Sequence, residues 1–116
     1  MDLINKKCVP CEGGTKPLDL AAAQKYLALV PLWQLDQGNG AITREIVFKD
    51  FASAINFINQ LAALAETEGH HPDFCLFSWN HVKLTLSTHA IKGLSENDFI
   101  LAVKTDQLLK KYPLTS

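Results

Sequence analysis

The sequence predicts a two-layer α+β domain in which a four-stranded antiparallel sheet carries three helices on one face, in the order α-β-β-α-β-β-α. Two segments have apolar residues at helical spacing, and a third helix follows a capping sequence near the C-terminus. Two pairs of strand-like segments are each joined by a short turn, which is typical of hairpins. Because each helix has one apolar stripe, all three are expected to pack on the same face of the sheet.

The first predicted helix spans residues 18–31. Asp19 is a suitable N-cap, and Pro31 stops the helix because proline cannot donate a backbone hydrogen bond. Its apolar stripe recurs at three- and four-residue steps and comprises Leu20, Ala23, Leu27 and Val30.

A hairpin is expected next, with strands at residues 32–35 and 42–49 around a Gly-Asn-Gly turn at 38–40. The second strand alternates, which predicts one buried face, although Arg44 falls on that face. The apolar residues expected to be buried there are Ile42, Ile46 and Phe48.

The second helix is expected to follow Asp50, its N-cap, and to stop at Gly69, a residue that favours the left-handed conformation at helix ends. Its apolar positions follow the helical period closely and are Phe51, Ala54, Ile55, Ile58, Leu61, Ala62 and Ala65.

The second hairpin is predicted to pair strands at residues 74–79 and 82–89 through a tight connection at Asn80-His81. Cys75 lies inside the first of these strands and is expected to be a buried small hydrophobe.

The last helix is expected to begin at Ser95, where Asp98 stands at the position that completes a capping box. A Thr-Asp pair at 105–106 interrupts its apolar stripe.

Composition argues against several classes of protein. The chain has 116 residues, enough for one domain, and its 47% hydrophobic and 20% charged residues are unlike a disordered sequence. The net charge of −1 gives no basic excess for nucleic acid or an anionic membrane. No apolar run has the length of a membrane span and the N-terminus does not resemble a signal peptide, so a cytoplasmic location is expected.

Residues 1–17 are expected to form an irregular arm, and residues 18–116 the single domain. The arm carries a C-x-x-C motif at Cys8 and Cys11. Alone, this motif is a weak indication of zinc, and it lacks the preceding strand that a redox motif requires. A structural or incidental use is favoured, and all three cysteines of the chain are expected to be reduced.

Three of the four histidines fall at adjoining ends of predicted elements. Pro72 keeps the chain extended at His71, so the imidazoles of His70 and His71 are expected to point in opposite directions. His89 lies one hairpin further on and can return to the pair. Imidazoles exchange protons near neutral pH, which suits acid–base catalysis. From spacing alone, ordinary surface histidines are about equally good an interpretation, and a zinc site is weaker because adjacent histidines rarely both bind one metal.

Two further residues have two interpretations each. Asp98 is expected first to complete the helix cap, and could also face the histidines. Trp33 is expected in the core, and could instead offer a flat surface to an aromatic ligand.

Four segments of the second half of the chain occur in a characteristic order. They are Glu68-Gly69-His70-His71-Pro72-Asp73, then Trp79-Asn80 with Val82, then Leu86-Ser87-Thr88-His89, then Gly93-Leu94-Ser95-Glu96-Asn97-Asp98. A looser match precedes them at Trp33 and Phe48-Lys49-Asp50-Phe51. Together these segments resemble the pterin-4a-carbinolamine dehydratase family, in the form found in bacteria and plants.

The resemblance implies the same α+β fold, assembled as a homodimer or homotetramer. It implies dehydration of 4a-hydroxytetrahydrobiopterin, the product left by aromatic amino acid hydroxylases, to quinonoid dihydropterin in tetrahydrobiopterin recycling, with no metal or organic cofactor. It places the catalytic residues at His70, His71 and His89. The candidate pterin contacts are Gly69, Pro72, Ser87, Thr88 and Ala90, joined by Asp98 and Trp33.

Two departures from the animal form stand out. That form has an acid immediately before the histidine pair, where this chain has Gly69 with Glu66 and Glu68 nearby, and the 72–82 hairpin is about one residue longer. A second class of function is a non-catalytic oligomerisation or regulatory partner on the same fold, because the animal protein also serves a homeodomain transcription factor as a dimerisation cofactor. Retention of all three histidines favours the enzyme.

Overall fold

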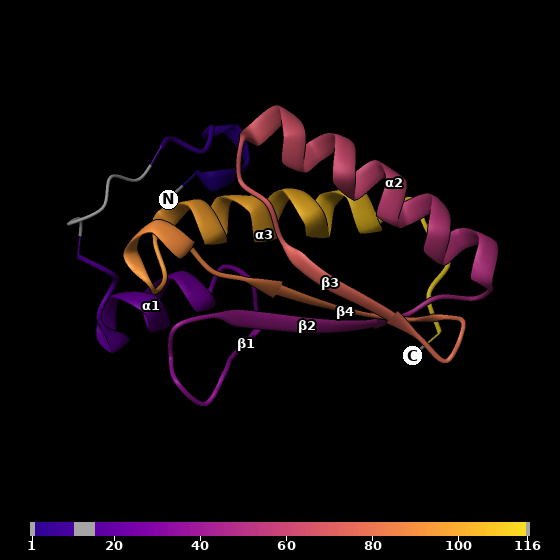
Figure 1. The fold of residues 1–116 in the computed structure, drawn as a ribbon, viewed down its shortest axis with the longest axis horizontal. Helices are drawn as coiled ribbons and strands as arrows, with labels where there is room; N and C mark the ends of the chain where they lie inside the picture. The colour runs from indigo at the N-terminus through magenta and orange to yellow at the C-terminus, as the bar shows by residue number, and fades with distance from the viewer. Residues whose placement is uncertain (1, 11–15, 116) are drawn as a thin grey trace.

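A four-stranded antiparallel sheet with helices on one face, as the sequence predicts, is the architecture of the protein (Figure 1). The structure is a computed structural model that describes residues 2–10 and 16–115. None of the helices within these ranges has the length and hydropathy of a membrane span. The elements are η1 (Leu3–Asn5), α1 (Leu20–Leu27), β1 (Gln34–Leu35), β2 (Ile42–Val47), α2 (Phe51–Glu68), β3 (Asp73–Phe77), β4 (His81–Leu86), η2 (His89–Ile91) and α3 (Glu96–Leu109).

The strands are ordered β1-β2-β4-β3, so each hairpin partner is a sheet neighbour and the two hairpins join through β2 and β4. The β2–β4 pairing runs from Ile42 opposite Leu86 to Val47 opposite His81. This order leaves β3 as an edge strand. It also brings the C-terminal end of β4 close to the chain that enters β3, because Thr85 pairs with Asp73.

The core lies between the helices and the inner face of the sheet. The predicted inward residues of β2 are confirmed, since Ile42, Ile46 and Phe48 are all buried. Phe48 packs on Phe57 of α2 with ring centroids 5.2 Å apart, and Tyr112 meets both rings edge-on. Such aromatic contacts add to the free energy gained by burying the rings.

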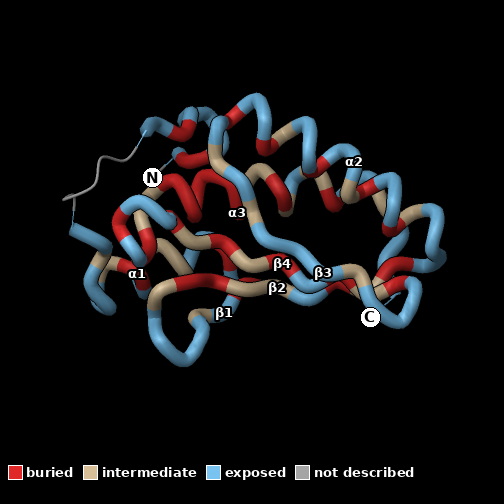
Figure 2. Tube along the Cα trace, viewed as in Figure 1, coloured by how far each residue is buried: buried red, intermediate tan, exposed pale blue. Residues whose placement is uncertain are grey.

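The apolar residues of α2 form two stripes, of which only one enters the core. The buried stripe is Ala54, Phe57, Leu61 and Ala65, with the polar residue Glu68 buried at its end. Phe51, Ile55 and Ala62, which the helical period assigned to the core face, are exposed, and Phe57, which it did not assign there, is buried. The prediction was wrong here because α2 covers the side of the sheet next to edge strand β3, so its second stripe reaches past the sheet. Figure 2 shows residues coloured as exposed along much of α2 and along β3.

Capping residues begin the helices where the sequence indicates. Asp19 and Asp50 accept hydrogen bonds from the backbone N–H groups of Ala22 and Ser53. The first helix is shorter than predicted: α1 ends at Leu27, turns continue to Pro31, and Leu20 is exposed rather than packed in the predicted stripe.

The second hairpin turns earlier than predicted. Ser78 and Trp79 both adopt left-handed backbone conformations, with φ of 48° and 59°, so they form the turn and His81 begins β4. β4 ends at Leu86, and His89 lies in η2 instead of a strand. Cys75 is exposed, contrary to prediction, because it lies on an edge strand.

The two polar interruptions of the apolar pattern contact each other. Arg44 donates to the Asp106 carboxylate at 2.6 Å from the helix-facing side of β2. The indole N–H of buried Trp33 donates to the same oxygen at 2.8 Å. A charge on an apolar face is tolerated when it is paired and hydrogen-bonded, so this cluster ties β2 to α3.

The N-terminal arm has one short helix, η1, and residues 6–10, 16 and 17 form no helix or strand. Leu3 and Cys8 are buried and belong to the same core cluster as the helices. The other cysteine of the C-x-x-C motif, Cys11, lies outside the described residues.

Candidate active site

A cavity of about 240 Å³ lies where the C-terminal ends of α2 and β4 meet the N-terminal end of α3. The chain reaches it at the end of α2 because Gly69 takes the left-handed conformation, φ 67°, and releases His70 and His71 from the helix. It returns through the turn after β4, which Thr88 and Gly93 close by backbone hydrogen bonds. The lining residues are Val9, Pro10, Gly69, His70, His71, Ser87, Thr88, His89, Ala90 and Asn97.

His70 is held by a carboxylate that is completely buried. Its Nε2 lies 2.6 Å from Oδ1 of Asp98, whose side chain is 0% exposed. The other oxygen of Asp98 accepts from the hydroxyl of Thr88 at 2.8 Å and from the backbone N–H of Ser95 at 3.0 Å. Because an ionised carboxylate only accepts hydrogen bonds, Asp98 places a proton on Nε2 of His70 and leaves Nδ1 available to a ligand.

Asp98 therefore has both of the roles considered from the sequence. Its hydrogen bond to the Ser95 N–H is half of the capping box that begins α3. Its other oxygen holds His70, which lines the cavity, while Asp98 itself is completely buried and does not line it, so it is not in position to contact a pterin as the sequence predicted. A network of this kind fixes the side chains in one arrangement when every member is satisfied.

His71 has a carboxylate partner of a different kind. Its Nε2 lies 2.9 Å from Glu66, and the two side chains are 64% and 77% exposed. Glu66 therefore gives the histidine pair a carboxylate partner, although Gly69 occupies the position immediately before the pair where the animal form has an acid. His71 also borders a smaller apolar hollow of about 160 Å³, together with Pro72 and Phe74.

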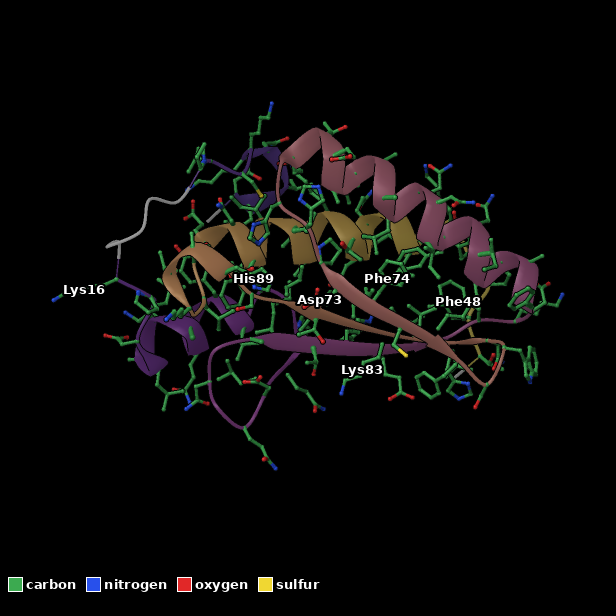
Figure 3. The ribbon with its side chains drawn as sticks, viewed as in Figure 1. Lys16, Phe48, Asp73, Phe74, Lys83 and His89 are labelled. Carbon is green, nitrogen blue, oxygen red and sulfur yellow. The ribbon has the colours of Figure 1, made fainter. Side chains whose placement is uncertain are left out.

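His89, labelled in Figure 3, reaches the cavity from the turn after β4. The turn is fixed by packing: a Cβ at Gly93 would lie 2.6 Å from a carbon of Pro17. The adjacent Leu94 carbonyl accepts from the N–H of Leu18 at 2.8 Å. Contacts with residues 17 and 18 therefore hold the position of η2.

The structure brings together most of the residues predicted from the sequence. His70, His71 and His89 line one cavity, and so do Gly69, Ser87, Thr88 and Ala90. Pro72 lies in the adjacent hollow. Trp33, predicted as a pterin contact, does not line the cavity, because it is buried in the core and bonded to Asp106.

Three lining residues were not predicted, namely Val9, Pro10 and Asn97. Asn97 lies inside the matched Gly93–Asp98 segment but has no spacing that marks it. Val9 and Pro10 belong to the arm, which lacks any periodicity. The two hydrogen bonds between Val9 and Asn97 cross 88 positions of sequence, which no local pattern can indicate.

A larger hollow of about 500 Å³ lies between α2 and α3, but it has no group suited to proton transfer near neutral pH. Its polar lining is amide, hydroxyl and lysine side chains: Gln60, Thr67, Lys104, Gln107, Lys110 and Lys111. In the ranges that the structure covers, no three histidine, cysteine or carboxylate residues are arranged to hold a metal ion. The histidine-lined cavity is the candidate active site.

Comparison with known proteins identifies the family. A family model described as pterin 4 alpha carbinolamine dehydratase matches residues 16–108. The chain belongs to this family. A protein of Azoarcus sp. (strain BH72) named "Putative pterin-4-alpha-carbinolamine dehydratase" is 47% identical over 92% of this chain and 91% of its own. A protein of the same name from Halorhodospira halophila is 44% identical over 93% of this chain and 98% of its own.

Solved structures of pterin dehydratase-like proteins share the fold. The crystal structure of a transcriptional coactivator/pterin dehydratase from Brucella melitensis has a TM-score of 0.75 and 35% identity, over 80% of this chain and 98% of that one. A pterin dehydratase-like protein identified as a RuBisCO assembly factor in the alpha-carboxysome has a TM-score of 0.56 and 26% identity, over 66% and 87% of the two chains. The pterin dehydratase fold thus occurs in proteins described by more than one function.

Proposed function

We propose that this chain is a hydro-lyase that dehydrates 4a-hydroxytetrahydrobiopterin to quinonoid dihydropterin in the cytoplasm. The observation that carries the proposal is the convergence of His70, His71 and His89 on one cavity, with His70 bonded to buried Asp98. Membership of the family supplies the substrate class. An aromatic amino acid hydroxylase would supply the substrate, because that reaction leaves a 4a-hydroxylated pterin.

The reaction requires two proton transfers. The C4a–O bond breaks as the hydroxyl group takes a proton and leaves as water, and a ring nitrogen loses a proton as the C=N bond forms. Two positioned imidazoles can serve as the acid and the base. The dehydration needs no redox partner, because water is the only group released.

His70 is the group best suited to accept the nitrogen proton. Asp98 keeps Nε2 of His70 protonated, so Nδ1 is the free acceptor, and the carboxylate stabilises the imidazolium that forms. His89 or His71, which line the same cavity, then protonates the departing hydroxyl.

Stopped-flow absorbance tests the activity. Freshly generated 4a-hydroxytetrahydrobiopterin is expected to decay to the quinonoid form faster with a substoichiometric amount of the protein than without it. The acceleration should survive EDTA and be lost in the triple variant of His70, His71 and His89 to alanine. Decay at the spontaneous rate with folded wild-type protein would contradict the proposal.

A non-catalytic binding role is the second candidate, and two observations favour it. The Brucella neighbour is described as a coactivator as well as a dehydratase, and the other neighbour as an assembly factor. This chain also exposes large apolar side chains on α2 and β3. If the protein is folded but inactive in stopped flow, this role becomes the better explanation of the fold.

We further propose that the protein self-associates through α2 and β3. The exposed apolar residues there are Phe51 and Ile55 on α2 and Phe74 and Phe77 on β3. Phe74 is 51% exposed and lies between β3 and α2 (Figure 3). β3 is also an edge strand, whose unpaired backbone groups can extend a sheet into a second copy.

Replacing Phe74 with lysine is expected to shift the protein from a homodimer or homotetramer to a monomer, because the charge would be buried without a partner in the interface. Light scattering coupled to size-exclusion chromatography measures the mass. Leu32→Lys is the matched control, since Leu32 is exposed just before β1, the edge strand on the opposite side of the sheet from β3. A monomeric wild type, or an unchanged mass in Phe74→Lys, would contradict self-association through this face.

A further inference from the structure

Residues 6–10, which we call the N-terminal strap, run past the end of α2 and the start of α3 and form one side of the histidine-lined cavity. Val9 and Pro10 are part of its lining. In Figure 1 this indigo segment lies beside the ends of both helices. The strap precedes residue 16, where the match to the family model begins.

The first turn of α3 binds the strap in the manner of a paired strand. The N–H of Val9 donates to Oδ1 of Asn97 at 3.0 Å, and Nδ2 of Asn97 donates to the carbonyl oxygen of Val9 at 2.5 Å. The amide side chain thus satisfies both backbone groups of one strap residue. Asn97 itself lines the cavity and immediately precedes Asp98, the residue that holds His70.

The last turn of α2 binds the strap through a buried ion pair. Glu68 accepts from the N–H of Cys8 at 2.9 Å and from Nζ of Lys104 at 2.7 Å. Although burial raises the pKa of Glu68, these hydrogen bonds and the Lys104 charge hold it below its ordinary value. A buried carboxylate is costly without such partners, so its place beside the strap indicates an anchoring role.

Cys8 takes part in the anchor and has no sign of reactivity. Its thiol donates to the carbonyl oxygen of Asn97 at 3.5 Å. Burial, followed by the Glu68 charge, raises the pKa of the thiol to about 12, so it is protonated at neutral pH. The strap is therefore fixed at Cys8 and Val9 by buried partners, yet the Val9 side chain is 64% exposed. A rigid backbone with exposed apolar side chains at a cavity is suited to contact a ligand.

We propose that the N-terminal strap is a specificity wall of the active site, meaning an apolar surface that the bound pterin contacts. Val9 and Pro10 make this contact, and Asn97 and Glu68 hold the strap in position. This inference rests on the proposed function. The strap wall is apolar, whereas the other side of the cavity carries the imidazoles, so a flat heterocycle can pack on the strap while its polar edge meets the histidines. Since Val9 and Pro10, the strap residues that line the cavity, have no side-chain group that transfers protons, they contribute to binding of substrate and transition state alike.

Steady-state kinetics separate this role from catalysis and from folding. The double variant Val9→Ala/Pro10→Ala is expected to raise KM about 3- to 10-fold, as expected from losing a few apolar contacts, with kcat unchanged. Asn97→Ala, which frees the strap, should raise KM at least as much. The matched control is Ile4→Ala in the same arm, because Ile4 is exposed and does not line the cavity. It should leave both constants unchanged.

Binding of tetrahydrobiopterin, measured by calorimetry without oxygen, gives a readout that does not depend on turnover, because this pterin has no 4a-hydroxyl group to lose. Its Kd should rise in parallel with KM in the strap variants. In the wild type, bound pterin should slow hydrogen exchange at the strap amides. A folded double variant with unchanged KM and Kd, or with a lower kcat alone, would contradict the proposed role of the strap and leave the dehydratase proposal intact. A wild type that neither binds nor dehydrates pterins would overturn both.

Discussion

Replacing His70 with alanine is expected to lower kcat for pterin dehydration by about 10²–10⁴-fold, the usual contribution of a positioned acid or base. His70 is the histidine whose protonation state is fixed by a buried partner, because its Nε2 is bonded to Asp98. Removing the imidazole removes the proton acceptor at Nδ1 and leaves a hollow next to the carboxylate. Single-turnover stopped flow measures the rate of the chemical step directly.

His89→Ala is expected to show a loss in the same range, and its stability should change little because His89 is exposed in η2. His81→Ala is the matched control. His81 is the fourth histidine of the chain, begins β4 and packs on Phe77, and does not line the cavity. Its replacement should leave kcat unchanged. Equal activity of the His70, His89 and His81 variants would show that the cavity is not where the pterin reacts.

The helices and strands could be predicted because their signals are local. Caps at Asp19, Asp50 and Ser95 and the alternation in β2 each depend on a few neighbouring residues. Side-chain exposure in α2 could not be predicted in the same way. The helical period places Phe51 and Ile55 beside the core stripe, and only the position of α2 over an edge strand shows that they lie outside it.

The burial of polar residues on apolar faces also could not be predicted from local sequence. Arg44 and Asp106 each interrupt an apolar pattern, and the sequence shows them as two unrelated exceptions. In the structure they form one ion pair, which also satisfies the indole of Trp33. A tertiary contact between distant segments explains both exceptions, and this contact also accounts for Trp33 lying in the core rather than at the histidine-lined cavity.

The candidate site was predictable as far as its residues lie at the ends of elements. The turn at Gly69 and the turn after β4 place three histidines on one cavity, and the resemblance to the family named them. The carboxylate partners were less accessible to sequence reasoning. Glu66 bonds to His71, while Glu68, two positions further along α2, faces the other way and holds the strap. Helical geometry separates them by about 200°, which decides their different roles.

Replacing Asp98 with alanine is expected to reduce the free energy of unfolding by about 3–5 kcal/mol, because three donors lose a buried charged acceptor and each hydrogen bond to a charged group typically contributes about 1.5–3 kcal/mol. Asp98 is completely buried and accepts from three groups: His70, Thr88 and the Ser95 N–H. Without the carboxylate, the Ser95 N–H loses its cap and Thr88 keeps only the hydroxyl of Ser95 as a partner. Urea unfolding followed by circular dichroism measures the change.

Asp98→Asn separates the structural role of this carboxylate from its catalytic role. The amide keeps the volume, and its oxygen can still accept from Thr88 and Ser95, so the loss of stability should be smaller than in Asp98→Ala. Towards His70, however, the amide presents an N–H group, which requires an unprotonated Nε2 and moves the imidazole proton to Nδ1. His70 then has no free acceptor, and kcat should fall about 10²–10⁴-fold.

Asp106→Asn is the comparison that makes this prediction decisive. Asp106 lies on the same helix and accepts from Arg44 and Trp33, so the substitution weakens a paired carboxylate in α3 without touching the cavity. It should lower stability and leave kcat unchanged. If Asp98→Asn also retained full kcat, Asp98 would only cap α3, and the proton acceptor would have to be sought at His89 or His71. If only Asp98→Asn loses activity, the loss cannot come from a weakened helix, because both variants weaken it.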